Sequence, residues 1–104
     1  MPGIQKIFIK GEHIIAEGSE GKSLYIIRSG RVEVYKQAKG KNVRLATLGP
    51  DEVFGEMSLI DNRYSKRTAS VRALEDTKVV ILDRKAFDEY MEQIPPGVYN
   101  LIQR

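Results

Sequence analysis

The first eighty residues consist of short runs rich in β-branched and aromatic residues, separated by glycines, and this pattern restricts the fold most strongly. In one run, Val32 and Val34 alternate with Arg31 and Glu33, as in a strand with one buried face and one wetted face. Short strands at regular spacing predict a small antiparallel barrel or sandwich. The expected strands are 7–9, 13–16, 24–28, 31–35, 42–48, 68–74 and 78–82.

Glycine-containing turns separate these runs. Ser29-Gly30 lies between two expected strands and is a two-residue hairpin signal. The lysine-rich stretch 36–41 is expected to be a hairpin tip, and residues 49–52 form a strong turn signal. We therefore expect residues 24–35 to form one β-hairpin.

The periodicity changes only after residue 82. Asp83 is a suitable N-cap for a helix over about 84–93, and Pro95-Pro96 would end that helix. Residues 97–102 resemble the start of another amphipathic turn. The apolar stripe of the expected helix contains Phe87, Tyr90, Met91 and Ile94.

The size and composition are those of one ordinary globular domain. The chain has 104 residues, of which 41% are apolar and 30% charged, so we expect a single domain over 1–104. No apolar run approaches the roughly 18 residues of a membrane helix, and the amino terminus has no apolar signal segment. These features predict a cytoplasmic location without membrane insertion. The absence of cysteine excludes disulfides, thiolate catalysis and cysteine-based zinc sites.

Basic residues are spread along the chain rather than gathered in one tract. The formal net charge is +3, and the densest basic stretches are 36–41 and 63–72. Few aromatic residues lie among these charges, although base-stacking platforms would require them. Direct binding of nucleic acid by this domain alone is therefore not expected.

A glycine, a carboxylate, a hydroxyl and a guanidinium are grouped around one short loop. The loop is Phe54-Gly55-Glu56-Met57-Ser58-Leu59, and Arg67-Thr68-Ala69 begins eleven residues after Glu56. Glycine lets backbone N–H groups approach phosphate oxygens, a following helical turn adds donors, and arginine offers a fork for two phosphate oxygens. Because a carboxylate would repel a phosphate, Glu56 is the better candidate to accept a sugar hydroxyl. These groups predict a site for a small ligand with a phosphate and a ribose hydroxyl.

The order of expected elements and this loop together resemble the cyclic-nucleotide-binding domain family. That family includes catabolite-activator-type transcription regulators, regulatory subunits of cyclic-nucleotide-dependent kinases, and the C-terminal domains of cyclic-nucleotide-gated channels. The resemblance runs from about Ile7 to Ile102 and is most specific at 54–59 and 67–71. It also includes Gly11-Glu12, Ala16-Glu17-Gly18, residues 24–30 and Leu48-Gly49-Pro50.

The resemblance implies a mainly β fold with a double-stranded β-helix, that is, an antiparallel, jelly-roll-like β-roll. The β-roll would cover about 7–83, interrupted by a short phosphate-cassette helix, and a C-terminal helical segment would cover about 84–104. The implied role is regulatory and not enzymatic, as part of signal transduction. Ligand binding would move the C-terminal helices and so signal to an effector domain or protein partner.

The resemblance also implies a cyclic purine nucleotide, cAMP or cGMP, as ligand, with no other cofactor and no metal. Gly55 and the N–H groups of Glu56, Met57 and Ser58 would line the phosphate cassette, and Glu56 would accept the ribose 2′-hydroxyl. Arg67 would pair with the cyclic phosphate. Thr68 would donate to a phosphate oxygen and could reach the exocyclic amine of a syn guanine. The expected ligand-binding residues are Phe54, Gly55, Glu56, Met57, Ser58, Arg67, Thr68 and Ala69.

In this family a C-terminal helix usually closes the site, and a longer last helix often mediates dimerisation. Tyr99, Leu101 and Ile102 are the candidates for a lid over the base, and a homodimer is one assembly that the family allows. Both termini look short for the family. This length indicates either a fragment or a naturally minimal domain.

Two features between the halves of the motif depart from the family pattern. The connection 60–66 looks longer than in most relatives, and Lys66 stands where a proline usually precedes the arginine. The loss of that proline removes a local restraint on the arginine. Arg63, in the same connection, is a competitor for the phosphate.

Simpler roles are open for the same residues. Arg67 could be an exposed loop residue, and Glu56 could cap a short helix or pair with a nearby arginine. The hydroxyls of Ser58 and Thr68 could satisfy local backbone groups. Arg44 lies on an expected strand that faces either the pocket or solvent, with contact to the base as the less favoured role.

Two other functions compete with nucleotide binding. A metal-dependent cupin-like enzyme needs a cluster of imidazole and carboxylate ligands, and the only histidine, His13, is expected to be a strand residue without a chemical role. The stronger alternative is a degenerate domain that keeps the fold as a protein-interaction module without nucleotide. The longer connection and Lys66 keep this alternative open.

Overall fold

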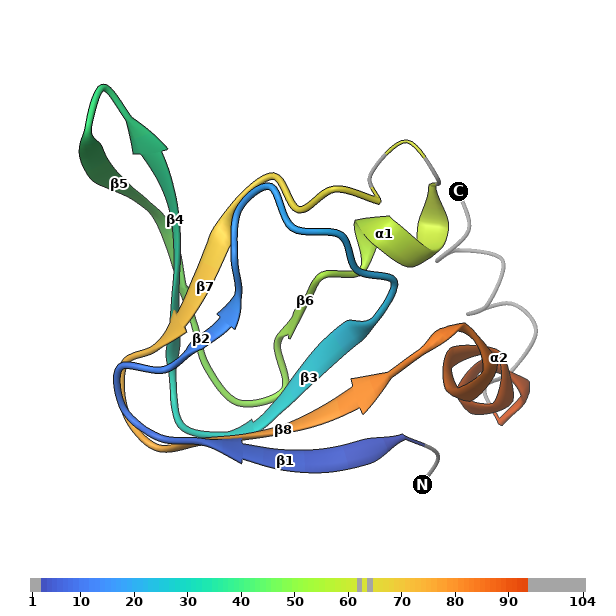
Figure 1. Cartoon of the computed structure of the whole chain (residues 1–104). Coiled ribbons are helices and arrows are strands. Elements are labelled where there is room, and N and C mark those ends of the chain that lie inside the picture. Colours follow the sequence, from blue (N-terminus) through green and yellow to red (C-terminus); the bar gives the residue numbers. More distant parts are fainter. Residues whose placement is uncertain (1–2, 62, 64, 94–104) are drawn as a thin grey trace.

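Two four-stranded antiparallel sheets pack face to face in the computed structural model, which describes residues 3–61, 63 and 65–93 (Figure 1). One sheet has the strand order β1-β8-β3-β6, and the other has the order β2-β7-β4-β5. This arrangement confirms the jelly-roll-like β-roll expected from the sequence. The strands are β1 (Ile4–Phe8), β2 (His13–Ile15), β3 (Leu24–Ser29), β4 (Val32–Ala38), β5 (Lys41–Leu48), β6 (Val53–Phe54), β7 (Ser70–Ala73) and β8 (Thr77–Leu82).

The core lies between the two sheets and is built from the inward-facing residues of both. Ile27 and Val79 from the first sheet and Val32 from the second are completely inaccessible to solvent. Burial of such apolar side chains contributes about 1.5–3 kcal/mol each to folding. The buried core cluster consists of Phe8, Ile15, Ile27, Val32, Phe54, Val71, Ala73 and Val79.

The chain changes sheets at Ser29-Gly30, so the hairpin expected there is wrong. β3 pairs with β6 and β8, whereas β4 pairs with β5 and β7. Gly30 has a φ of +92°, and a Cβ at this position would lie 2.5 Å from Thr77 Oγ1 and 2.6 Å from the Asp76 carbonyl oxygen. The glycine is needed because the chain turns sharply against residues 76–77 while crossing between layers.

The crossings from β1 to β2 and from β7 to β8 lie at the same end of the sandwich (Figure 1). Backbone hydrogen bonds join the three corners. The Gly11 N–H donates to the Ala73 carbonyl (2.8 Å), the Ala73 N–H to the Glu12 carbonyl (2.9 Å), and the Leu74 N–H to the Arg31 carbonyl (2.9 Å). These bonds close one end of the roll and leave the loops that carry the motif residues on the other.

Short β6 is the strand that the sequence pattern did not reveal, because two residues are too few to show alternation. Tyr25 pairs with Phe54, and their rings stack with centroids 4.9 Å apart and planes within 5°. This pairing fixes the start of the loop that begins at Gly55. β1 also begins earlier than expected, at Ile4 rather than Ile7.

In the described part of the chain, two helices accompany the sheets. The four-residue helix α1 (Met57–Ile60) follows β6, and α2 (Arg84–Glu92) follows β8. The expected cap is confirmed, because the Asp83 carboxylate accepts the Ala86 N–H at 2.8 Å. Within the described residues, no helix is both long and apolar enough to cross a bilayer. Ile94 and the expected turn at 97–102 lie outside the described part of the chain.

The apolar face of α2 packs on the outer side of the first sheet. Met91 is buried at 3% exposure, and Phe87 and Tyr90 pack against a buried cluster that also includes Leu59 of α1. The other members of this cluster are Leu24, Val80 and Leu82. The two helices are therefore joined through one shared apolar contact region.

Candidate functional site

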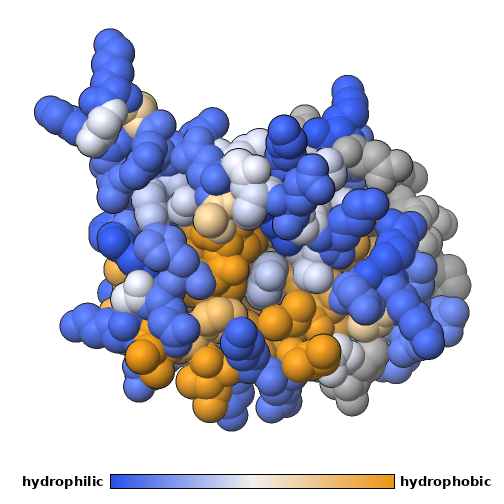
Figure 2. Space-filling model, in the orientation of Figure 1, coloured by the Kyte–Doolittle hydropathy of each residue, from blue (hydrophilic) through white to orange (hydrophobic). Residues whose placement is uncertain are grey.

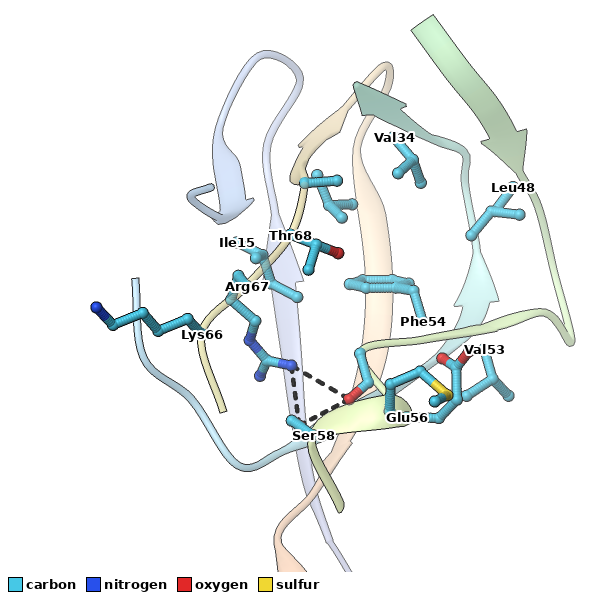
Figure 3. A pocket seen from close by; sticks show the side chains of 14 residues that line it. Ile15, Val34, Leu48, Val53, Phe54, Glu56, Ser58, Lys66, Arg67 and Thr68 are labelled. Atoms are coloured by element: carbon cyan, nitrogen blue, oxygen red, sulfur yellow. Dashed lines mark hydrogen bonds between the residues drawn. The ribbon is translucent and has the colours of Figure 1, made fainter. Parts of the chain in front are cut away.

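A pocket of about 400 Å³ opens between β6, α1 and the segment 66–69 (Figure 3). All eight residues singled out in the sequence line it. The structure therefore brings the two halves of the motif together, although seven or more residues separate them along the chain. The other lining residues are Ile15, Val34, Leu48, Val53, Lys66 and Val71.

The apolar wall of the pocket was not anticipated from the sequence. Ile15, Val34 and Val71 come from three strands of one sheet, and Val34 is paired with Val71 across β4 and β7. In the sequence these residues follow the same alternating pattern as the core, so nothing separates a pocket wall from buried packing. In the orientation of Figure 1, the space-filling view in Figure 2 shows hydrophobic surface in the middle of the molecule, between the two sheets and surrounded by hydrophilic side chains.

At Gly55 the cassette loop passes very close to the segment around Ser23 and to the side chain of Arg67. Its φ is +80°, and a Cβ there would lie 2.9 Å from the Ser23 carbonyl oxygen and 3.1 Å from Arg67 Nη1. A side chain would therefore strain the backbone and press against both groups. This geometry explains why a glycine begins the cassette loop.

Arg67 is almost completely buried, at 9% exposure, which rules out the alternative of an exposed loop residue. Its guanidinium donates from Nη2 to the Ser23 carbonyl (2.9 Å) and from Nη1 to Ser58 Oγ (3.0 Å) and the Gly55 carbonyl (3.2 Å). Figure 3 shows the guanidinium between the loop and the strand wall. All three acceptors are neutral, and no ion pair of the described residues includes Arg67.

The backbone around Arg67 is held by the loop between β2 and β3 (residues 16–23). The Gly18 N–H donates to the Arg67 carbonyl (2.7 Å), and the Arg67 N–H donates to the Ser19 carbonyl (2.8 Å). A third bond runs from the Gly21 N–H to the Ser65 carbonyl (3.1 Å). The restraint that a preceding proline would give locally thus comes from a distant loop. The Lys66 side chain extends away from the other labelled residues (Figure 3).

Ser58 combines a local role with a role in the pocket. Its hydroxyl donates to the Gly55 carbonyl at 2.8 Å and accepts the bond from Arg67. Thr68 is exposed at the pocket wall. The Ser58 hydroxyl is therefore hydrogen-bonded within the protein, whereas Thr68 is exposed in the pocket.

Glu56 is half-buried at the start of α1 and faces the pocket. Its side chain makes no capping hydrogen bond to α1, and it belongs to none of the ion pairs found among the described residues. Neither simpler role proposed from the sequence is therefore seen. The carboxylate also reaches the edge of a second, apolar cavity of about 440 Å³ under α2.

Several other residues considered from the sequence lie away from the pocket. Arg44 pairs with Glu33 and does not line the pocket. Arg63 binds the Asp61 carboxylate through Nε and Nη2 and is also absent from the lining. His13 forms a hydrogen bond with a tyrosine hydroxyl on β4. The lid candidates Tyr99, Leu101 and Ile102 lie outside the described residues.

Glu33 is a buried carboxylate on the second sheet, shared by two arginines. Its oxygens accept from Arg44 Nη2 at 2.5 Å and from Arg72 Nη2 at 2.9 Å, and its side chain is 8% exposed. The pKa of Glu33 is lowered, mainly by the hydrogen bond from Arg44. Burial of the carboxyl acts in the opposite direction and raises the pKa, whereas the charge of Arg72 lowers it further. The ionised form is therefore the one that stabilises the fold.

The Glu33→Gln substitution is expected to lower the free energy of unfolding at neutral pH by about 1–2 kcal/mol, because both arginines are partly exposed and screened. A lowered folded-state pKa gives stability that is present above the unfolded-state pKa and is lost as pH falls through the folded-state pKa. The difference between parent and variant should therefore shrink on acidification. Urea denaturation at several pH values in the acidic range measures the free energy of unfolding of both proteins. If the difference between them did not change with pH, the ionised Glu33 carboxylate would not be the stabilising form.

Comparison with known proteins supports one family. The family model of the cyclic nucleotide-binding domain matches residues 5–94. The cyclic AMP receptor protein of Thermus thermophilus is 37% identical over 98 residues, which cover 93% of this chain and 44% of that protein. The chain therefore spans less than half the length of this curated relative.

Solved structures agree with the sequence match. The half-site-occupied form of the EAL enzyme Bd1971 gives a TM-score of 0.85 at 37% identity, covering 97% of this chain and 89% of that one. The same enzyme has cAMP-bound and cGMP-bound forms, with TM-scores of 0.77 and 0.78. The cAMP-bound protein PfPKA-R gives 0.77 at 39% identity, covering 85% of this chain and 31% of that one. This chain belongs to the cyclic nucleotide-binding domain family.

Proposed function

We propose that this domain binds a cyclic purine nucleotide, cAMP or cGMP, in the pocket of about 400 Å³ and acts as a regulatory unit without catalysis. One observation carries the proposal: the buried Arg67 guanidinium faces the pocket with only neutral acceptors. Buried charges in proteins are normally paired, so the arrangement suits an anion supplied by a ligand. The singly charged cyclic phosphate matches it in charge and size.

The ribose would lie against Glu56. A ligand hydroxyl can donate to a half-buried carboxylate that is occupied neither by capping nor by an ion pair. This carboxylate and the guanidinium of Arg67 lie on the same pocket, as a nucleotide with adjacent sugar and phosphate groups requires. We therefore assign Glu56 to the ribose 2′-hydroxyl and Arg67 to the phosphate.

The remaining pocket residues fit the rest of the nucleotide. The apolar wall offers contact to the flat base, and Phe54, Gly55, Met57, Ser58 and Ala69 complete the lining around the phosphate and sugar. The exposed hydroxyl of Thr68 is available to a phosphate oxygen or to the exocyclic amine of a syn guanine. Both cAMP and cGMP are therefore candidate ligands.

The regulatory output would pass through α2. The Leu59 carbonyl at the end of α1 accepts a bond from Arg84 Nη1 at 2.6 Å, and the Leu59 side chain lies in the cluster under α2. A ligand that prefers one position of α1 therefore shifts the population of α2 positions. We propose that this shift reaches an effector domain or protein partner, with a homodimer as one possible assembly.

Titration of the full chain with cAMP and with cGMP tests this function. We expect measurable heat of binding and an increase in melting temperature that grows with ligand concentration, because a ligand that binds only the folded state stabilises it. A larger increase with one nucleotide would establish the base preference. If neither nucleotide gives heat or stabilisation at millimolar concentration, the domain keeps the fold only as an interaction module.

A further inference from the structure

The loop between β2 and β3 lies directly against the guanidinium of Arg67, although the motif does not include this loop. A Cβ added at Gly21 would lie 2.7 Å from Arg67 Nη2, 2.9 Å from Nε and 3.1 Å from Cζ. Real Cβ atoms do not approach other heavy atoms as closely as the first two distances. The guanidinium therefore occupies the space that any other residue at position 21 would fill.

Gly21 is needed for space and not for an unusual backbone conformation. Its φ lies outside the left-handed region, so an alanine can adopt the same backbone. The three atoms nearest to an added methyl group all belong to the end of one flexible side chain. A substitution here therefore acts on Arg67 and leaves the surrounding backbone in place.

The same loop also supplies an acceptor and the backbone support for this arginine. Ser23 accepts from Arg67 Nη2, and Gly21 donates its N–H to the carbonyl of Ser65, two residues before the arginine. Gly55 borders the opposite edge of the guanidinium, where a Cβ would lie 3.1 Å from Nη1. The guanidinium is thus held in a slot between two residues that lack side chains.

We propose that Gly21 is a positioning residue for the phosphate contact: the missing side chain at position 21 sets the position of the Arg67 guanidinium and thereby the affinity for the anionic ligand. This inference rests on the proposed function, in which Arg67 binds the cyclic phosphate. A displacement of the guanidinium by about 1 Å is enough to misalign a charge-assisted contact, because such contacts depend on distance and direction.

The Gly21→Ala substitution in the full chain tests this proposal. We expect the dissociation constant for cAMP or cGMP to rise about 10-fold or more, measured by calorimetry, with a change of only a few degrees in the melting temperature of the ligand-free protein. Gly49→Ala is the matched control, because Gly49 also lies outside the left-handed region and a Cβ there meets nothing within 4 Å. The control should bind like the parent chain.

A double-variant cycle shows whether Gly21 acts through Arg67. In the Arg67→Ala background all the guanidinium atoms that the added Cβ would meet are gone, so Gly21→Ala should change the affinity by much less than in the parent chain. If Gly21→Ala lowers the melting temperature strongly, the double variant should melt at the same temperature as Arg67→Ala alone, because the clash has been removed. An equal effect of Gly21→Ala in both backgrounds would overturn the positioning role.

A readout without ligand separates this inference from the proposed function. Gly21→Ala should shift the Nε–H resonance of Arg67 in the ligand-free protein, and Gly49→Ala should not. If the parent chain binds nucleotide and Gly21→Ala binds equally well, the inference fails while the function stands. If the parent chain binds no nucleotide, the function fails, and an unshifted resonance would then overturn the positioning role as well.

Discussion

Arg67→Ala is expected to weaken binding of cAMP and cGMP by at least about 100-fold, because it removes charge-assisted hydrogen bonds to the phosphate worth about 1.5–3 kcal/mol each. The loss should be similar for both nucleotides, since the phosphate is common to them. Calorimetric titration at one salt concentration measures it. The substitution also leaves the Ser23 and Gly55 carbonyls without their donor, so the melting temperature of the ligand-free variant must be recorded in parallel.

Arg63→Ala is the matched control for this substitution. Arg63 lies four residues before Arg67 and carries the same charge, but it is exposed and does not line the pocket. Its removal should leave the affinity within about 2-fold of the parent, as expected for an exposed charge. If Arg63→Ala weakened binding more than Arg67→Ala, the phosphate contact would belong to Arg63.

Gly30→Ala is expected to lower the free energy of unfolding by about 2–5 kcal/mol, the largest stability effect we foresee. The φ of +92° costs a non-glycine residue about 1–2 kcal/mol. The added Cβ also overlaps backbone and side-chain atoms at 2.5–2.7 Å in the corner between the sheets, and such overpacking costs about 1–3 kcal/mol more. Urea denaturation measures the sum.

Gly40→Ala separates the two contributions. Gly40 has a similar φ of +77°, but a Cβ there meets nothing within 4 Å. Only the conformational cost of about 1–2 kcal/mol should remain, because the φ is left-handed but the added Cβ meets no other atoms. If both variants lost the same free energy of unfolding, the backbone at Gly30 would accommodate a Cβ without strain. The crossing between the sheets would then not depend on close packing at this glycine.

The sequence predicted the strands well because alternation is a local property. Val32 and Val34 indicate an inward face of β4, whichever strand pairs with it. The wetted face expected at Glu33 is wrong, because Arg44 and Arg72 cover this carboxylate and bury it. Pairing partners depend on the layers, and a glycine between two strands signals a turn equally well for a hairpin and for a crossing. The hairpin at Ser29-Gly30 was therefore predicted wrongly, although both strands were found.

The polar half of the candidate site was predictable for a different reason. Glu56 and Arg67 belong to residue types whose chemistry limits their use near a glycine turn. Gly21 and the apolar wall carry no such signal, because a loop glycine and an inward-facing valine occur throughout β-rolls. Their roles depend on distances between segments that lie far apart in the chain, and those distances exist only in the folded protein.

The neutral partners of Arg67 affect the electrostatic potential in the pocket. Two carbonyls and a hydroxyl orient the guanidinium but leave its charge uncancelled, so the side of the pocket around Arg67 keeps a positive potential, whereas Glu56 makes another part of the lining negative. Much of the cost of removing this charge from water is already met during folding. Mobile ions screen such a buried charge much less than an exposed one, so attraction for an anion persists at physiological ionic strength.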